Sequence, residues 1–379
     1  ETLRACGSER LADADDLGDA TDGAARYSLD LVARFDDGFD SADESTWADR
    51  MQRELPNVRF ARSAYIERGS VDELLDLCRR LARWARMRSA SEVWSWYDDL
   101  LERVPGDDPR RPAALALHAQ AAWRRGDIAG ARDEAAEALA RSRAGDEWTR
   151  FQALGELGTE LLFEGDNAGA LRVWSEQAEL RHDGIALGSA AVAAAYSGDI
   201  DLARTLIADG RRSTSMPATT ACWLDYCEAE TEHTVGSADP DTLERAIERA
   251  HELDCSFIVG VATMTLATVL EAHGDAAGAA MRYRDLISHW FRSGSWTQQW
   301  TTLRHVAELI EDSHPETALA ILRTAIADGT SVPALDDESE ERLGSLRRRL
   351  EELVGRRDLP GVSRVEVAEM ARAALAQTV

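Results

Sequence analysis

The feature that most constrains this sequence is a short turn that occurs four times between helix-forming segments. Each copy contains Gly-Asp, and an alanine follows the glycine by five residues. Glycine adopts the left-handed conformation that ends one helix, and aspartate caps the next helix by accepting backbone N–H bonds. The small alanine lets the two helices cross closely. The four pairs are Gly126 and Ala131, Gly165 and Ala170, Gly198 and Ala203, and Gly274 and Ala279.

The spacing of these turns gives the length of the repeat. Ala170 follows Ala131 by 39 residues, and Ala203 follows Ala170 by 33. Helix pairs of this length, repeated about seven times, are typical of tetratricopeptide (TPR) arrays. Strand signals are nearly absent, so we predict an all-α protein. Its architecture is a right-handed superhelix of stacked antiparallel helix hairpins, a TPR-like α-solenoid.

The repeat pattern divides the chain into three parts. We expect residues 1–50 to be a helical tail of a preceding winged-helix module, or an N-terminal cap, with helices over Leu3–Leu11 and Ala24–Phe35. Residues 51–330 form the repeat array. Residues 331–379 comprise an acidic linker, 331–340, and two capping helices, Arg342–Val354 and Val365–Gln377. Terminal repeats need a polar outer face, which these segments provide.

Charge excludes several functions. The net charge is −26, and all 43 basic residues are arginine. Nucleic acid is therefore not an expected partner, because binding it needs many basic contacts to phosphate. Without lysine these residues cannot form a P-loop or a pyridoxal Schiff base. Adaptation to high salt is a less favoured explanation of the acidity than a solvated acidic surface.

The cysteines and the hydropathy pattern indicate a cytoplasmic protein. No two cysteines form a C-x-x-C pair, and most lie in apolar helical stretches, as expected of reduced core residues. They are Cys6, Cys78, Cys222, Cys227 and Cys255. No run of eighteen apolar residues occurs, so we expect no contact with a membrane. The chain begins at Glu1 without methionine, which suggests a piece of a longer protein.

Several short motifs resemble those of bacterial signalling ATPases. The phrases Glu1-Thr-Leu-Arg4 and Glu9-Arg-Leu11 are similar to the end of a winged-helix module, and Glu54-Leu-Pro-Asn-Val-Arg59 is similar to the motif E-x-x-N-L-R-A-A. Ser91–Leu101 resembles the first hairpin of the array. Val365–Ala371 resembles its closing helix. Together they resemble the C-terminal TPR (MalT-like superhelical) region of STAND or NB-ARC-type ATPases, in particular actinobacterial LuxR-family regulators or nucleotide-cyclase-linked ATPases.

The resemblance implies a role in signal transduction or transcription regulation. In such proteins the repeat array is a sensor that holds or releases an upstream nucleotide-binding domain of the same parent chain. The ATPase and the DNA-binding helix-turn-helix are absent from these residues, so the parent's activity is not assigned to them. We expect no enzyme activity, and no cofactor.

Metal binding is a weak alternative. Four Glu-x-x-His steps occur, a spacing that di-metal helical bundles use. Each step lies in a different helix, and two of them are expected roughly 15 Å apart along antiparallel helices. A histidine near a helix C-terminus is favoured by the helix dipole and explains most of them. We therefore expect no metal site and no catalytic residues.

The candidate binding site is the concave groove of the superhelix, which the first helix of each hairpin lines. Large rigid aromatic side chains with polar neighbours make good binding anchors. The predicted groove residues are Gln120, Trp123, Arg124, Gln152, Thr159, Tyr196, Trp223, Trp296 and Trp300, and the same mapping places Glu311 nearby.

Two functions follow from this pattern. The first is a sensor or scaffold module that binds a protein, a peptide or a small effector in the groove and regulates an upstream nucleotide-binding switch. The alternative is a free-standing TPR adaptor or oligomerisation scaffold without a small-molecule ligand. An enzyme hidden in a helical toroid is disfavoured, because no spacing pairs the carboxylates.

Overall fold

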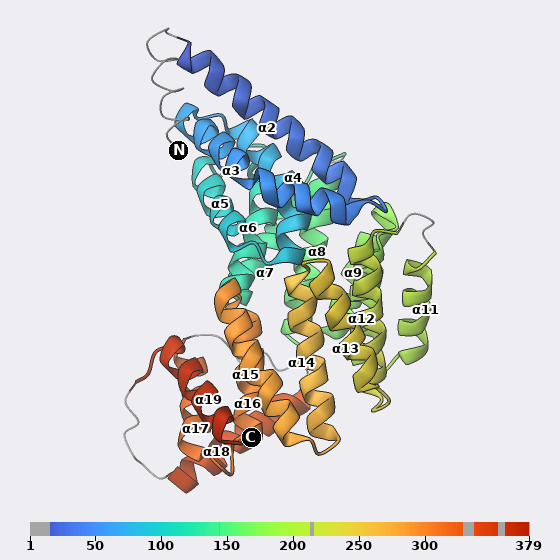
Figure 1. Ribbon diagram of the computed structural model, residues 1–379, viewed down its shortest axis with the longest axis vertical. Coiled ribbons are helices and arrows are strands. Elements are labelled where there is room, and N and C mark those ends of the chain that lie inside the picture. The colour runs from blue at the N-terminus through green and yellow to red at the C-terminus, as the bar shows by residue number, and fades with distance from the viewer. Residues whose placement is uncertain (1–15, 144, 213–215, 329–336, 355–360, 379) are drawn as a thin grey trace.

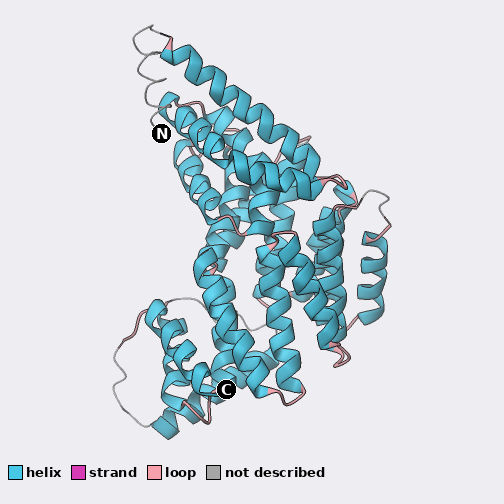
Figure 2. Cartoon of the chain, viewed as in Figure 1, coloured by secondary structure: helices cyan, strands magenta, loops and turns pink. Residues whose placement is uncertain are grey.

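The structure, a computed structural model, describes residues 16–143, 145–212, 216–328, 337–354 and 361–378. Over these ranges the chain folds into eighteen helices and no strand, which confirms the all-α prediction (Figure 2). The helices are α2 (Leu17–Phe39), α3 (Glu44–Arg68), α4 (Val71–Arg88), α5 (Ser91–Arg103), α6 (Arg111–Arg125), α7 (Ile128–Arg141), α8 (Glu147–Phe163), α9 (Asn167–Arg181), α10 (Gly184–Tyr196), α11 (Ile200–Gly210), α12 (Ala218–Thr234), α13 (Pro240–Glu252), α14 (Ser256–Ala272), α15 (Ala276–Ser293), α16 (Trp296–Leu309), α17 (Pro315–Ala327), α18 (Asp337–Val354) and α19 (Arg364–Thr378).

The Gly-Asp turns have the predicted geometry. Gly126 has φ +97°, and the carboxylate of Asp127 accepts from the Gly130 backbone N–H at 2.9 Å. The other three turns repeat both features, with aspartate-to-backbone bonds of 2.8 to 3.1 Å. Each turn thus satisfies backbone groups at two helix ends and folds the chain back on itself.

The alanines that follow these turns are fully buried. Ala131, Ala170, Ala203 and Ala279 have no exposed surface, and each lies on the second helix of its hairpin. A larger side chain there would push the two helices apart, because interiors are close-packed. The hairpins run from α4–α5 to α16–α17.

The hairpins wind into a turn that closes on itself. Helix α4 lies against α14, and α6 lies against α16, although these helices are far apart in sequence. In Figure 1 the N-terminal helices lie at the top and the C-terminal helices at the bottom, with the array between them. The even-numbered helices α4 to α16 form the inner layer, as expected of the first helices of TPR-like hairpins.

Helices lie in both terminal segments of the described chain. The helix expected over Ala24–Phe35 lies within α2, which packs against α3, whereas Leu3–Leu11 lies outside the described residues. Residues 337–340 belong to α18, so the predicted linker is too long by these four residues, and 331–336 lie outside the described part. The predicted capping helices correspond to α18 and α19.

None of the helices described here combines the length and the apolar character that crossing a membrane requires.

Candidate functional site

A cavity of about 780 Å³ lies within the superhelical turn. Every inner helix from α4 to α16 contributes side chains to its lining. Its volume falls in the range of pockets that hold small molecules. Two polar clusters stand out in the lining, and they differ in how well their hydrogen bonds are satisfied.

The first cluster, which we call the arginine wall, comprises Arg86, Gln120, Arg124 and Glu156. Arg86 forms an ion pair with Glu156, which is almost fully buried, while a quarter of the Arg86 side chain is exposed. The Gln120 amide, oriented to suit its neighbours, accepts from Arg86 Nε and Nη2 at 3.0 and 3.1 Å. Gln152, one helical turn earlier on α8, donates to Glu156 at 2.6 Å. Glu156 thus pairs with Arg86 and accepts a further hydrogen bond from Gln152.

Arg124 is the other cation of this wall. It is 2% exposed, and its Nη2 donates to the Arg86 backbone carbonyl at 3.0 Å. No described residue accepts from its Nε or Nη1, and no carboxylate pairs with it. Its guanidinium instead lies 4.6 to 5.3 Å from the ring centroids of Trp94, Trp123 and Phe257. Burial, and next the charge of Arg86, lower the pKa of Arg124 to about 9.

The second cluster, the tyrosine wall, comprises Tyr196, Tyr226, Glu230 and Thr265. The Glu230 carboxylate accepts from the Tyr196 hydroxyl at 2.6 Å and from the Thr265 hydroxyl at 2.5 Å. Burial, and next the charge of Glu230, raise the pKa of both tyrosines well above the usual range. Both hydroxyls therefore keep their protons and stabilise the buried carboxylate.

A third set of cavity residues is basic. Arg304 and His305 on α16 line the cavity with Arg342 of α18, which pairs with Glu308 at 3.2 Å. Burial, and next the charge of Arg304, lower the pKa of His305 well below its usual range. The His305 ring is therefore neutral at neutral pH, and it stacks on Tyr283 at 6.1 Å.

The structure brings most of the predicted groove residues together. Six of them line the cavity: Gln120, Trp123, Arg124, Thr159, Tyr196 and Trp223. Trp223 is held in place because its indole N–H donates to the Ile185 carbonyl at 3.1 Å. A Cβ at Gly188 would lie 2.7 Å from that indole nitrogen, so glycine allows this close approach. These residues share one cavity; that they bind a ligand stays a prediction.

The other predicted groove residues lie elsewhere. Gln152 bonds to Glu156 from one helical turn earlier and is not part of the lining, and Trp300 is fully buried in the core. Trp296 packs on Trp300 and under Arg364, while Glu311 forms an ion pair with Arg349 on α18. The cavity face of α16 instead carries Gln298, Thr301 and His305, which are spaced for one helix face, and positions 296 and 300 project from another.

Sequence reasoning missed several polar lining residues. Arg86, Glu156 and Thr265 were not singled out, and Glu230 was noted only as part of a Glu-x-x-His step, although each lies on an inner helix. One signal was available: Glu230 follows Trp223 by seven residues, so both lie on one helix face. The pairing of Glu230 with Thr265 on the next hairpin depends on how the hairpins stack, which the sequence does not show directly.

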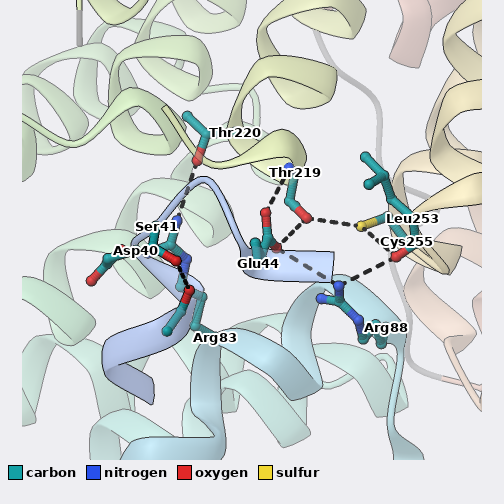
Figure 3. Close-up of polar contacts among 10 residues, drawn as sticks. Asp40, Ser41, Glu44, Arg83, Arg88, Thr219, Thr220, Leu253 and Cys255 are labelled. Carbon is teal, nitrogen blue, oxygen red and sulfur yellow. Dashed lines mark hydrogen bonds and ion pairs between the residues drawn. The ribbon is translucent and has the colours of Figure 1, made fainter. Parts of the chain in front are cut away.

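A buried polar cluster, which we call the clasp, joins α3 and α4 to segments far along the chain, and this contact closes the superhelical turn into a ring (Figure 3). Glu44, on the first turn of α3, accepts from the Thr219 backbone N–H at 2.8 Å and from the Thr219 hydroxyl. Helix α12 has no side-chain cap of its own, so Glu44 caps it from 175 residues away. Arg88 approaches Glu44 at 3.7 Å and donates to the Leu253 carbonyl at 3.2 Å.

Among the described residues no cluster of histidine, cysteine or carboxylate side chains is arranged to hold a metal ion. The four described cysteines are buried, and burial raises the pKa of the thiols of Cys78 and Cys222 to about 12. Thiols with such pKa values are poor nucleophiles.

Comparison with known proteins supports the fold. No protein-family model matches the chain, and no curated protein does. A Rap protein complexed with Competence and Sporulation Factor is similar at 13% identity and a TM-score of 0.50, over 82% of this chain and 88% of that one. A STAND protein with a tetratricopeptide repeat sensor, from Pyrococcus horikoshii, is similar at 14% identity and a TM-score of 0.43, over 89% of this chain and 52% of that one.

A third similar structure is the C-terminal part of a TPR repeat-containing protein from Cytophaga hutchinsonii, at 13% identity and a TM-score of 0.31, over 69% of this chain and 98% of that one. At such identities a likeness shows the fold alone. The chain is a TPR-like helical repeat protein.

Proposed function

We propose that this chain is a ligand-binding sensor module that holds a small effector or a short peptide in its central cavity. The observation that supports this most is the cavity itself, to which all seven inner helices contribute. A ligand there contacts the whole superhelical turn at once, so binding changes the relative stability of open and closed forms of the ring.

The clasp supplies a route from binding to response. Glu44 and Thr219 join the start of the array to its fifth hairpin, and the Thr297 hydroxyl joins α16 to α6 by donating to the Trp123 carbonyl. A ligand that fits the closed ring better than the open ring stabilises these contacts by its difference in affinity. The Rap protein of similar fold was solved with a bound factor, so such a fold can hold a partner.

The motif resemblance supports a more specific role. We propose that the array senses a signal for an upstream nucleotide-binding domain of a cytoplasmic bacterial regulator or cyclase-linked ATPase. A reading frame that encodes a P-loop and a winged helix upstream of Glu1 is the expected finding. A frame that starts a few codons upstream would contradict the sensor role and favour the free-standing adaptor.

Filling the cavity tests ligand binding. Thr159 lines the cavity, and its hydroxyl donates to the backbone carbonyl four residues earlier. We expect Thr159→Trp to occupy the space and to abolish the thermal stabilisation that a defined library of metabolites and short peptides gives to the wild type. A bound ligand at a hundred times its Kd stabilises by about 2.7 kcal/mol.

The control is Thr205→Trp. Thr205 makes the same type of bond to a carbonyl four residues earlier, but it is exposed on the outer helix α11. Circular dichroism should show that both variants keep their helices. If Thr159→Trp responds to every compound that stabilises the wild type, the cavity is not the binding site.

A further inference from the structure

Charge inside the cavity is opposite in sign to that of the whole chain. The chain carries a net charge of −26, yet the lining contains four arginines and two glutamates. The arginines are Arg86, Arg124, Arg304 and Arg342, and the glutamates are Glu156 and Glu230. A site that merely followed the composition of the chain would be acidic. The lining therefore favours an anion over a cation of the same shape.

Part of the excess positive charge lies at the arginine wall. Arg86 and Glu156 balance each other, so the charge of Arg124 has no carboxylate partner among the described residues. Glu160 is also buried near Arg86, but burial raises its pKa well above the usual range and favours its neutral form. A buried cation without a counter-charge is costly, and an anion bound beside it would offset this cost.

Arg86 provides the accessible part of this wall. Its side chain is one quarter exposed, and no described residue accepts from its Nη1. Arg124 lies directly behind it, bonded to the Arg86 carbonyl, and has negligible accessible surface. A ligand anion would thus contact Arg86 and be attracted in addition by Arg124.

Aromatic side chains lie next to this wall. Trp123 packs edge to face on Phe163 at 5.3 Å, and Phe257 stacks on Trp223 at 6.1 Å. All four side chains line the cavity. Aromatic surfaces of this kind favour a flat apolar body. In contrast, the Glu230 carboxylate already accepts hydrogen bonds from two hydroxyls and makes a poor partner for an amine.

We propose that the cavity selects a small organic anion, with its carboxylate or sulfonate at Arg86 and Arg124 and an aromatic or apolar body against Trp123, Phe163 and Phe257. This inference rests on the proposed function, because it assigns the chemical class of the effector that the cavity holds.

Two dyes of matched shape test the charge preference. The anionic probe is 8-anilino-1-naphthalenesulfonate, and N-phenyl-1-naphthylamine has the same ring system without the sulfonate. We expect the wild type to bind the anionic dye at one site, at least about tenfold more tightly than the neutral dye. Indole-3-butyrate should displace it, whereas indole-3-butyramide should not.

Variants of Arg124 test whether the anionic group binds at the arginine wall. Arg124→Met should weaken binding of the anionic dye about tenfold and leave the neutral dye unchanged, and Arg124→Lys should restore most of the affinity. The control is Arg125→Met, because Arg125 is the next residue on α6 but pairs with Asp98 at the exposed surface. It should leave both dyes unaffected.

The outcomes separate the two proposals. The anion assignment would be overturned if the wild type bound the two dyes equally well, or if Arg124→Met bound the anionic dye as well as the wild type does. In that case the binding function still stands if Thr159→Trp blocks binding of the neutral dye. If neither dye binds in a way that Thr159→Trp blocks, the binding function fails as well. Should Arg124→Met not fold, the two wild-type affinities and the displacement by indole-3-butyrate alone decide.

Discussion

The two walls of the cavity differ in the partners that they give to a buried charge. At the tyrosine wall, hydroxyls from α10 and α14 donate to Glu230 and satisfy it within the protein. At the arginine wall, Arg124 is just as deeply buried but has aromatic rings for neighbours and two N–H groups without acceptors. A buried charge that is satisfied within the protein needs no ligand, whereas an unsatisfied one attracts a ligand of opposite charge.

Glu230 has a structural role, whereas Arg124 is a candidate for ligand binding. Glu230 connects α10, α12 and α14, three successive inner helices, so it stabilises the stacking of the hairpins. Arg124 makes one hydrogen bond between inner helices, to the Arg86 carbonyl, so we expect it to add less to that stacking. The predictions below test this difference, in order of decreasing effect on the free energy of unfolding.

Loss of Glu230 should have the largest effect. Glu230→Ala leaves the Tyr196 and Thr265 hydroxyls without their acceptor and removes charge-assisted bonds, which together should lower the free energy of unfolding by about 2–4 kcal/mol. Urea denaturation measures this. The control is Glu232→Ala on the same helix, since Glu232 pairs with Arg204 near the surface and should cost less than about 1 kcal/mol. Equal losses in the two variants would show that the hydrogen bonds of the tyrosine wall do not stabilise the fold.

Opening the clasp should have the next largest effect. Glu44→Ala leaves the Thr219 N–H unpaired and Arg88 without its carboxylate, so we expect a loss of about 1–3 kcal/mol and a larger radius of gyration in small-angle scattering. Glu54→Ala, on the same helix, removes only a surface bond to Asn57 and serves as the control. An unchanged radius of gyration in Glu44→Ala would show that other contacts hold the ring closed.

Glu160, which is buried near the arginine wall, should make the stability of the protein depend on pH. Its folded-state pKa is raised well above the 4.5 of the unfolded chain, so the contribution of Glu160 to stability is fully present below pH 4.5 and is lost as pH rises through the folded-state pKa. Glu160→Gln does not titrate. Its stability relative to the wild type should therefore increase by about 1–3 kcal/mol between pH 5 and pH 8. Parallel stability curves of the two proteins over this window would mean that Glu160 is paired.

Arg124 should matter least for stability. Arg124→Met keeps most of the side-chain volume and leaves no orphaned carboxylate, so the free energy of unfolding should change by less than about 1 kcal/mol. The same denaturation series measures it beside Glu230→Ala. A loss as large as that of Glu230→Ala would make Arg124 a structural residue and remove the contrast between the walls.

Local features of the fold were predictable, and long-range contacts were not. The Gly-Asp turns identified the ends of four helices, because a left-handed glycine and a capping carboxylate act over a few residues. Trp123 was placed on the inner surface for the same reason, since Gly126 follows it by three residues and the register of a hairpin follows from its turn. No Gly-Asp turn follows α16, and Trp296 and Trp300 lie outside the cavity lining.

The sequence alone determined the repeat, the helical class and which helix of each hairpin faces inward, since all three depend on local periodicity and on turns. Only the tertiary structure decided that the array closes on itself, that Glu44 caps a helix 175 residues away, and that Arg124 lacks a counter-charge. The physical reason is that small rotations between successive hairpins accumulate along the superhelix. Their sum, which no single repeat encodes, decides which distant charges meet.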